Sequence, residues 1–339
     1  MVGVDLGGTN VRACVFNSDG EEAGQRYEIP SHAQNGTEAI LDAVAECIGK
    51  AIDQASAKPK AVGIAIPGHI DNVAGIVRWA PNLGKQVDGV FRYWENVDIR
   101  GPLTKRIGIP VQMGNDANLA ALGEYRFGSG KDSATCLVLI TVGTGIGGGV
   151  VMAPVSLFGE VGGPVVLLGG NQGGAELGHL TVLHGGLDCN AGSYGALEAY
   201  CQRDSIVKRA LHKLRRGRKS SLPDLVGGDL AKISPKDISD AAHAGDEVAL
   251  EVWEEVGTML GVGIGSVINV FAPQIVAVGG QIAKVGEPLL GPARKTARNV
   301  AVPSLFKDAT IVEAEKGDDA GMLGAAALAT EFLRISSHA

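Results

Sequence analysis

Several features that mark other classes of protein are missing from this sequence of 339 residues. Basic residues are not in excess: the formal net charge is −7, which argues against a nucleic-acid partner or an anionic membrane. A local basic run at residues 208–219 has helical spacing and is expected to be a solvated helix face. The apolar stretch at residues 256–277 is interrupted by glycines, Asn269 and Pro273. It therefore predicts a buried helix followed by a strand rather than a membrane span.

Cysteine is also scarce. The five cysteines are odd in number and lie largely within apolar segments, which is typical of reduced thiols in a cytoplasmic protein. No signal peptide precedes Val2, which is expected to belong to the first strand. We therefore expect a cytoplasmic location.

The common phosphate-binding loops are missing as well. The sequence contains no G-x-x-x-x-G-K-[ST] motif, and no helix is expected after its first glycine pair. Neither the Walker nor the Rossmann mechanism of phosphate binding therefore applies.

A glycine-rich turn lies instead between two apolar, β-branched segments at residues 2–4 and 11–15. Its adjacent glycines leave no side chain in the way, so backbone N–H groups and the Thr9 hydroxyl can point at a phosphate. Asp5, at the end of the first strand, can hold a hydrated Mg²⁺. Taken alone, the segment fits a tight turn in a surface hairpin equally well. The residues assigned to phosphate or metal contact are Asp5, Gly7, Gly8, Thr9 and Asn10.

A second turn of the same kind occurs within residues 137–151, where Gly143, Thr144 and Gly145 separate two apolar segments. Two such hairpins about half a chain apart suggest two similar subdomains, each offering a turn to one ligand. A further pair, Gly279–Gly280, follows the expected strand at 275–278. Glycines there would let a flat adenine or ribose approach the backbone, although ordinary strand-to-helix turns also contain them.

Asp116 is the candidate general base. It follows the expected strand at residues 111–113 and lies between Asn115 and Asn118, a polar position where a carboxylate can accept a hydroxyl proton. The alternative is that Asp116 caps the helix expected at residues 117–125, because aspartate is a favoured N-cap. The two roles are compatible.

Glu176 and His179 share a face if they lie on one helical turn. A carboxylate beside an imidazole suits the hydroxyls of a polyol. An ordinary surface pair, or half of a Glu-x-x-His metal site, are the alternatives; because only one such half-site occurs, a di-metal centre is disfavoured. Glu198 would be a third polar group. Gly68 and Asn82, both expected at strand ends, are weaker candidates for the pocket wall.

The order and spacing of these motifs resemble the ROK family (repressors, open reading frames, kinases), within the sugar-kinase branch of the actin–hexokinase superfamily. The resemblance implies an α/β fold of two ribonuclease-H-like domains with a cleft between them. We expect residues 1–118 plus 320–339 in the first domain and 119–319 in the second. The matching segments are Gly63–Gly68, Ala80–Gly84, Gly114–Asn118, Gly143–Gly149, Glu176–His179, Pro273–Gly280 and Gly317–Gly321.

The resemblance also implies an activity. Members of the family include bacterial glucokinases, so the expected reaction is transfer of the γ-phosphoryl of ATP, with Mg²⁺, to the 6-OH of glucose. Another hexose or hexosamine (fructose, N-acetylmannosamine), polyphosphate as donor, and a non-catalytic sugar sensor remain alternatives. A homodimer is expected. The family's base matches Asp116, and its sugar contacts match Asn115, Asp116, Glu176, His179 and Glu198.

Three departures from the family pattern stand out. The helix-turn-helix domain of the repressors is not expected, and residues 153–170 form a longer connection that could be a lid or an oligomer contact. The family's structural zinc has one His and three Cys ligands. His179 and Cys189 match, but Ala191 and Ala196 occupy the other two positions. Alanine cannot ligate, so we predict no structural zinc unless Asp188 or His184 substitutes. The two alanines would then hold the loop by packing, leaving His179 free for the sugar.

Overall fold

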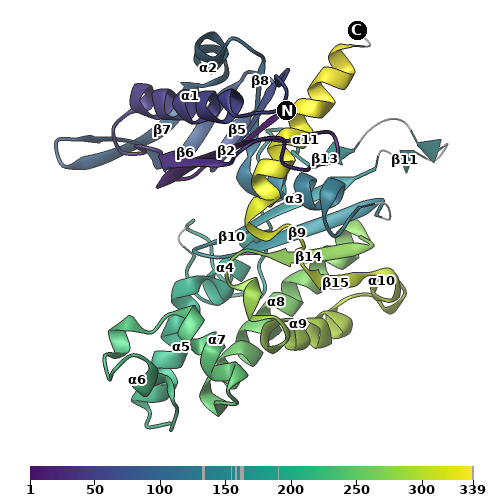
Figure 1. Ribbon diagram of the computed structural model, residues 1–339. Coiled ribbons are helices and arrows are strands. Elements are labelled where there is room, and N and C mark those ends of the chain that lie inside the picture. The colour runs from purple at the N-terminus through teal and green to yellow at the C-terminus, as the bar shows by residue number, and fades with distance from the viewer. Residues whose placement is uncertain (132–133, 154, 157–158, 161–163, 190, 338–339) are drawn as a thin grey trace. The chain divides into compact units, whose positions relative to one another are not determined.

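The computed structural model describes residues 1–131, 134–153, 155–156, 159–160, 164–189 and 191–337. The chain divides into two compact units (Figure 1). The first unit comprises Met1–Ser133, Gly149–Ala175 and Asp318–Ala339, and the second comprises Ala134–Gly148 and Glu176–Gly317. Residues 119–133 and 149–175 thus group with the first unit, although the sequence places them in the second domain.

The first unit is built on a five-stranded sheet with the order β3-β2-β1-β4-β8. Strands β1 and β2 are antiparallel, whereas β1, β4 and β8 are parallel. The parallel strands therefore end at the same edge, where the polar segments after β4 and β8 meet. The strands are β1 Val2–Leu6, β2 Asn10–Val15, β3 Tyr27–Pro30, β4 Val62–Ile66 and β8 Val111–Asn115.

Helices cover both faces of this sheet. Val2, Val4 and Leu6 of β1 join the apolar cluster formed with α1 (Thr37–Asp53). Gly3, on the opposite face because strand side chains alternate, meets α11 (Ala320–Ser336). A Cβ on Gly3 would lie 2.1 Å from the Met322 carbonyl oxygen, so glycine lets the α11 backbone rest directly on the strand.

Helix α3 (Asp116–Phe127) explains why the first unit extends beyond residue 118. It packs on α11 through a pair of glycines: a Cβ on Gly123 would lie 2.2 Å from the Ala320 carbonyl oxygen, and one on Gly324 would lie 1.6 Å from that of Leu119. This close approach makes α3 part of the same packed layer as α11.

A second, three-stranded sheet contains β5 (His69–Asp71), β6 (Ile76–Val87) and β7 (Val90–Asp98), and α2 (Arg100–Ile107) follows it. The long connection predicted at residues 153–170 contains the short strands β11, β12 and β13. Strand β13 pairs with the end of β10 (Ile146–Met152) through Val151 and Val166. Residues 154, 157–158 and 161–163 lie outside the described part. The short strands are β11 Val155–Ser156, β12 Gly159–Glu160 and β13 Val165–Val166.

A second five-stranded sheet, with the order β13-β10-β9-β14-β15, repeats the design of the first, because a hairpin is followed by parallel strands. The apolar stretch at 256–277 is the end of helix α8 followed by strand β14, as predicted. None of the helices in the described part of the chain has the length and apolar character that a membrane crossing would need. The strands are β9 Cys136–Val142, β10 Ile146–Met152, β14 Ile275–Gly279 and β15 Thr310–Glu313.

Helices α8 and α9 form the largest helical pair of this unit, joined by glycines of α8 against the α9 backbone. A Cβ on Gly257 would lie 2.5 Å from the Leu289 carbonyl oxygen. The helices of the second unit are α4 Leu197–Cys201, α5 Arg203–Arg215, α6 Leu222–Leu225, α7 Pro235–His243, α8 Glu247–Phe271, α9 Glu287–Val300 and α10 Pro303–Asp308.

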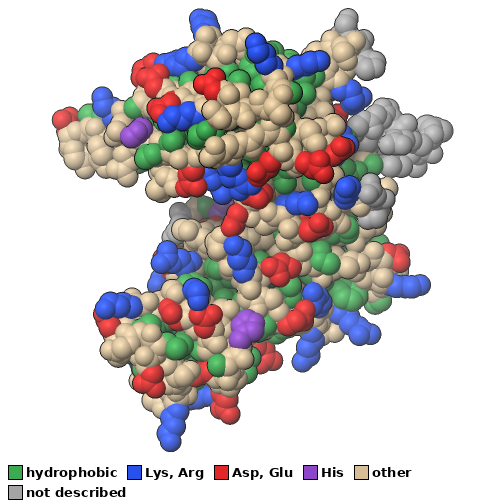
Figure 2. Space-filling view, viewed as in Figure 1, with side chains coloured by type: hydrophobic (Ala, Val, Ile, Leu, Met, Phe, Trp, Pro, Cys, Tyr) green, Lys and Arg blue, Asp and Glu red, His purple; other side chains and the backbone are tan. Residues whose placement is uncertain are grey.

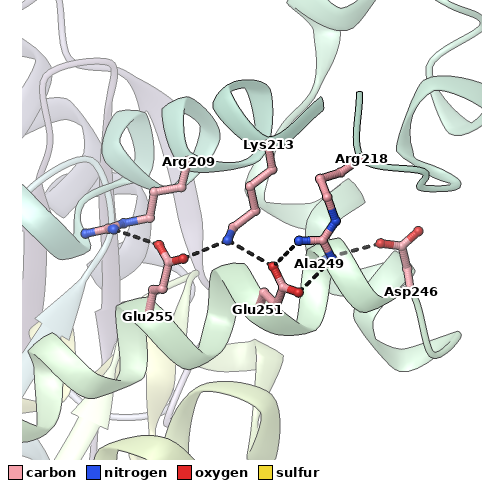
Figure 3. Close-up of polar contacts among 7 residues, drawn as sticks. All are labelled: Arg209, Lys213, Arg218, Asp246, Ala249, Glu251 and Glu255. Carbon is pink, nitrogen blue, oxygen red and sulfur yellow. Dashed lines mark hydrogen bonds and ion pairs between the residues drawn. The ribbon is translucent and has the colours of Figure 1, made fainter. Parts of the chain in front are cut away.

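The basic run at 208–219 is not wholly the solvated face that we predicted. Arg209 donates to Glu255 at 2.9 Å, Lys213 contacts Glu255 at 2.7 Å and Glu251 at 3.0 Å, and Arg218 contacts Glu251 at 2.7 Å (Figure 3). These pairs join α5 and the segment after it to α8. Elsewhere, Lys and Arg side chains are interspersed with Asp and Glu over the visible surface (Figure 2).

Candidate functional site

The first glycine turn joins the antiparallel strands β1 and β2, as predicted. Gly8 and Thr9 are exposed, and the Gly7 N–H donates to the Asn10 carbonyl at 2.9 Å, which closes the turn. The Asn10 amide donates to Glu28, so this side chain is engaged within the sheet. A Cβ on Gly8 would lie 3.5 Å from Asn82 Cβ, which places Asn82 beside the turn.

Asp5 lies directly opposite Arg12 in the β1–β2 ladder, and the Arg12 guanidinium donates to Asp5 Oδ2 at 2.5 Å. Arg12 also donates to the Asp318 carbonyl at 3.1 Å, and a Cβ on Gly321 would lie 3.9 Å from Asp5 Cγ. The segment Gly317–Gly321 therefore adjoins the first turn. Asp5 still presents a second carboxylate oxygen, which fits Mg²⁺ because this ion is typically held by one or two carboxylates together with substrate phosphates.

The candidate base stands where β8 ends and α3 begins. The structure assigns the N-cap of α3 to Asn115, whose Oδ1 accepts from the Asn118 N–H at 3.0 Å. The cap role considered for Asp116 is therefore wrong. Asp116 Oδ1 accepts from the adjacent Ala117 N–H at 2.8 Å, and the side chain is half-buried. This bond holds the carboxylate at the edge of the sheet, at the first residue of α3.

Gly68 lies beside this pair. The Asn115 amide donates to the Gly68 carbonyl at 2.9 Å, which joins the ends of the neighbouring strands β4 and β8. Gly68 has a φ of 110°, and a Cβ there would lie 2.2 Å from the Trp79 carbonyl oxygen, so the position requires glycine. Asn82, in contrast, does not lie at a strand end, so this prediction is wrong. It is exposed within β6, at an irregularity in the pairing with β7 between Ala80 and Gly84.

A buried carboxylate anchors the loop that precedes Glu176. Asp71 accepts from Arg78 at 2.6 Å and from the Gln172 amide at 2.9 Å, while the Gln172 carbonyl oxygen accepts from the Asn72 N–H at 2.7 Å. The Ala74 backbone N–H, with Arg78 and Gln172, lowers the pKa of Asp71 to about 2. The paired amide bonds of Gln172 fix this loop to β5, a contact that the sequence did not suggest because about a hundred residues separate the partners.

The second glycine turn joins β9 to β10. The Gly143 N–H donates to the Gly145 carbonyl at 2.9 Å, and the Ile146 N–H donates to Glu198 Oε2 at 2.8 Å. A Cβ on Gly145 would lie 2.6 Å from the same carboxylate oxygen, so glycine is needed for Glu198 to approach. Glu198, which we assigned to the sugar, therefore also supports the turn that we assigned to the nucleotide.

A cavity of about 570 Å³ opens beside this turn within the second unit. Gly143 and Thr144 form one wall. The predicted glycine pair also lies here: Gly280 has a φ of 86°, a Cβ on it would lie 2.4 Å from the Val142 carbonyl oxygen, and the following Gln281 lines the cavity. Gly143, Thr144 and the residue that follows the Gly279–Gly280 pair thus border one space.

Another part of the cavity lining was not predicted. Ser234 and Lys236, at the start of α7, line it together with Arg203. Ser234 and Asp237 form a capping box, and the Ser-Pro-Lys-Asp sequence carries that helix-start signal. The sequence therefore locates the beginning of α7 but not the cavity that it borders.

Glu176 precedes a short 3-10 helix, η1 (Leu177–His179), and His179 is its last residue; the His179 N–H donates to the Glu176 carbonyl at 3.1 Å. Glu176 is exposed and His179 is half-buried. The prediction that His179 is left free is wrong. Its Nδ1 lies 3.7 Å from Cys189 Sγ, and this sulfur lies 3.9 Å from Glu198 Oε1. Two of the predicted sugar ligands are thus linked through a thiol.

The segment that carries the zinc pattern is held by hydrogen bonds. Ala196 is fully buried, but Ala191 is exposed, so the predicted packing of both alanines is wrong for Ala191. The Tyr200 hydroxyl accepts from the Leu187 N–H at 2.7 Å, and the Cys189 N–H donates to the Ser193 carbonyl at 2.7 Å. These bonds give the loop a support that requires no metal.

The ligand set does not fit a structural zinc. Such a site needs four N or S donors in a tetrahedron, and at the four positions of the family pattern this chain keeps only His179 and Cys189. Among the described residues, no three His, Cys, Asp or Glu side chains converge in a way that could hold a metal ion. The lack of zinc remains a prediction for metal analysis.

The chain has two compact units, each with a glycine hairpin. The ROK family model matches residues 1–332, so the chain belongs to the ROK family. The glucokinase of Thermotoga maritima is 37% identical over 332 residues, covering 98% of this chain and 97% of that protein. The DNA-binding transcriptional dual regulator NagC of Escherichia coli is 30% identical over 332 residues, which cover 96% of this chain and 74% of the regulator.

A solved structure gives the same result. The ROK family glucokinase from Streptomyces griseus, in complex with glucose and AMPPNP, superposes with a TM-score of 0.78 and is 32% identical, covering 98% of this chain and 99% of that one. This similarity confirms the predicted α/β fold of the actin–hexokinase type.

Proposed function

We propose that this protein is an ATP-dependent hexose kinase that transfers the γ-phosphoryl group of ATP to the 6-OH of glucose. The observation that carries the proposal is Asp116, which is held at the end of β8 beside Asn115 and Gly68 with its carboxylate at the strand edge. The glucokinases of T. maritima and S. griseus, similar over nearly the whole chain, support the same activity.

Asp116 would accept the proton of the attacking hydroxyl. Its neighbours restrict its orientation, because Asn115 is fixed by bonds to Gly68 and Asn118 and the Ala117 N–H holds Asp116 Oδ1. A carboxylate fixed in this way can align a hydroxyl oxygen with a phosphorus atom, and positioning is the larger part of catalysis in phosphoryl transfer. In this proposal, Glu176, His179 and Glu198 bind hydroxyls of the sugar.

The cavity of the second unit would hold the nucleoside part of ATP. Its size suits a nucleoside, and the exposed Thr144 at its wall offers a hydroxyl to a phosphate. The exposed residues Gly8 and Thr9 of the first turn would supply further donors. Mg²⁺, held by Asp5 and the phosphates, would supply charge neutralisation when bound.

A kinase for another hexose or hexosamine is the nearest alternative, because the same carboxylates and imidazole suit several sugars. A sugar-responsive regulator is the second, since NagC is similar over most of this chain. The presence of Asp116 and of both glycine turns favours the kinase over a binding-only role.

We further propose that the kinase is a cytoplasmic homodimer. Light scattering on the purified chain measures the subunit number; a mass near twice 34.8 kDa would support the dimer, and one near 34.8 kDa would contradict it.

The activity is tested by measuring ADP release from ATP with a panel of sugars: glucose, fructose, mannose, N-acetylmannosamine and N-acetylglucosamine. We expect glucose to give the largest kcat/KM. A larger kcat/KM with a different sugar would identify that sugar, rather than glucose, as the substrate. Binding of a sugar without turnover would favour a sugar-responsive regulator.

A further inference from the structure

Cys189 lies between two side chains that the proposed function assigns to the sugar. Its Sγ is 3.7 Å from His179 Nδ1 and 3.9 Å from Glu198 Oε1, both within the reach of a hydrogen bond to sulfur. The side chain is 7% exposed, so bulk water does not compete freely for these contacts. The three residues thus form a short chain from imidazole to thiol to carboxylate.

Proton counting gives this chain a direction. A thiol has one proton, a carboxylate only accepts, and a neutral imidazole has one donor and one acceptor nitrogen. The thiol proton is best placed on the side of Glu198, because a hydrogen bond to an ionised acceptor is stronger than one to a neutral acceptor. Sulfur is then left as an acceptor for an Nδ1–H of His179. In this arrangement both contacts of the sulfur are hydrogen bonds. If the thiol donated to His179 instead, no proton would lie between sulfur and Glu198 Oε1.

Two members of this chain, Glu198 and Cys189, are anchored by backbone hydrogen bonds. Glu198 Oε2 accepts from the Ile146 N–H at 2.8 Å, which holds the carboxylate against the glycine turn. The backbone of Cys189 is fixed by the bond from its N–H to the Ser193 carbonyl at 2.7 Å. The carboxylate and the thiol are therefore preorganised before any ligand binds.

We propose that Cys189 is a positioning residue that holds His179 in the tautomer with the proton on Nδ1. Nε2 then presents a lone pair and accepts a hydrogen bond from a sugar hydroxyl, rather than donating one. This inference rests on the proposed function, since it assigns His179 a direction within the sugar site.

The tautomer is measured directly by two-bond ¹H–¹⁵N correlation spectra of the wild-type protein labelled with ¹⁵N-histidine, at a pH where the ring is neutral. The His179→Gln variant identifies the His179 signals among those of the seven histidines. We expect the pattern of an Nδ1–H tautomer. An Nε2–H tautomer in the wild-type protein would overturn the proposal, whether or not the protein proves to be a kinase.

Kinetics test the positioning. Cys189→Ala removes the thiol that links His179 to Glu198, whereas Cys189→Ser retains a group that both donates and accepts. Cys136→Ala is the control, because it removes a buried thiol of β9 outside the site. We expect Cys189→Ala to raise the KM for glucose roughly 3- to 10-fold, the size of one net hydrogen bond, with kcat and the KM for ATP changed less. Cys189→Ser should restore most of the loss, and Cys136→Ala should leave the KM for glucose unchanged.

Two outcomes would contradict the positioning role. One is Cys189→Ala with unchanged KM for glucose and an unchanged His179 tautomer. The other is equal loss in Cys189→Ala and Cys136→Ala, which would indicate a general effect of removing a buried thiol. Failure of the kinase proposal is distinguishable, because the wild-type protein would then turn over none of the sugars while its His179 spectrum could still be recorded.

Discussion

The carboxylate of Glu198 accepts a hydrogen bond from the backbone N–H of Ile146 at 2.8 Å. This bond connects a side chain of α4, assigned to the sugar, with the β9–β10 turn, assigned to the nucleotide. Because both groups belong to the second unit, the connection is part of that unit's own fold. A disturbance of the turn should therefore reach the sugar side chains.

The glycine at position 145 tests this connection. Gly145→Ala would place a Cβ 2.6 Å from Glu198 Oε2 and displace the carboxylate, whereas a Cβ on Gly143 meets nothing within 4 Å. We expect Gly145→Ala to lower the free energy of unfolding by about 1 kcal/mol, the value of one hydrogen bond, and Gly143→Ala to change it little. Denaturant unfolding of both variants gives the comparison; equal stability would show that the Glu198 contact is not needed.

Replacing the candidate base should separate chemistry from binding. Asp116→Asn keeps an oxygen that can accept from the Ala117 N–H, so the start of α3 should stay folded. We expect kcat to fall by at least ~10²-fold, as for a lost general base, with glucose affinity largely kept. Steady-state kinetics with calorimetry of glucose binding measure both, and near-normal turnover would place the base elsewhere.

The two turns should act on the nucleotide. Thr144→Val removes an exposed hydroxyl at the cavity wall, and Gly8→Val adds a side chain to the exposed first turn. We expect Thr144→Val to weaken ATP-analogue binding roughly 10-fold or more, the size of a hydrogen bond to a charged group, with a smaller change for glucose. Gly8→Val should act in the same direction. Calorimetry that finds glucose affinity lost and nucleotide affinity intact would refute this assignment.

The ion pairs between α5 and α8 predict a dependence of stability on pH. Hydrogen bonds from Arg218 and Lys213 lower the pKa of Glu251 from 4.5 to about 2. Since the folded pKa is the lower one, the stabilisation is complete above pH 4.5 and is lost as the pH falls toward 2. Glu251→Gln should destabilise the protein at neutral pH and reduce the loss on acidification.

Glu254 supplies the matched control, because it lies on the same helix and its side chain makes no ion pair in the described part of the chain. Thermal unfolding of wild type, Glu251→Gln and Glu254→Gln between pH 2 and 7 tests the prediction. If both variants show the same pH profile, the α5–α8 pairs contribute nothing specific to stability.

The zinc prediction is tested by metal analysis of protein purified without chelator. We expect well below one zinc per chain, because Ala191 and Ala196 occupy two ligand positions of the family pattern. One tightly held zinc per chain that disappears in Cys189→Ala would contradict it.

The features that the sequence predicted correctly are local ones. Both glycine hairpins, and the position of Asp116 at the end of β8, depend on residues adjacent in the chain. The family pattern then supplied the fold. The choice of Asn115 rather than Asp116 as the helix cap was beyond prediction, because both residue types are good caps and the backbone direction decides between them.

Contacts across long distances in the chain were missed. Lys213 donates to Glu251 and Glu255, which are about forty residues away in the chain. The basic run that we predicted to be a solvated face is therefore partly a helix interface. The contacts of the Cys189 thiol with His179 and Glu198, which are ten and nine residues away, were missed as well. The periodicity of a segment does not reveal which distant charges will face it.

The central claim is phosphoryl transfer to a sugar hydroxyl, and ³¹P and ¹H NMR of the product tests it most directly. Wild-type protein is incubated with ATP, Mg²⁺ and glucose, with Asp116→Asn as the control. We predict one ADP per sugar consumed and a phosphate on the 6-oxygen of glucose, formed at least ~10²-fold more slowly by the variant. ATP and glucose that remain unchanged with wild-type protein, or a product that Asp116→Asn forms at the same rate, would contradict the account.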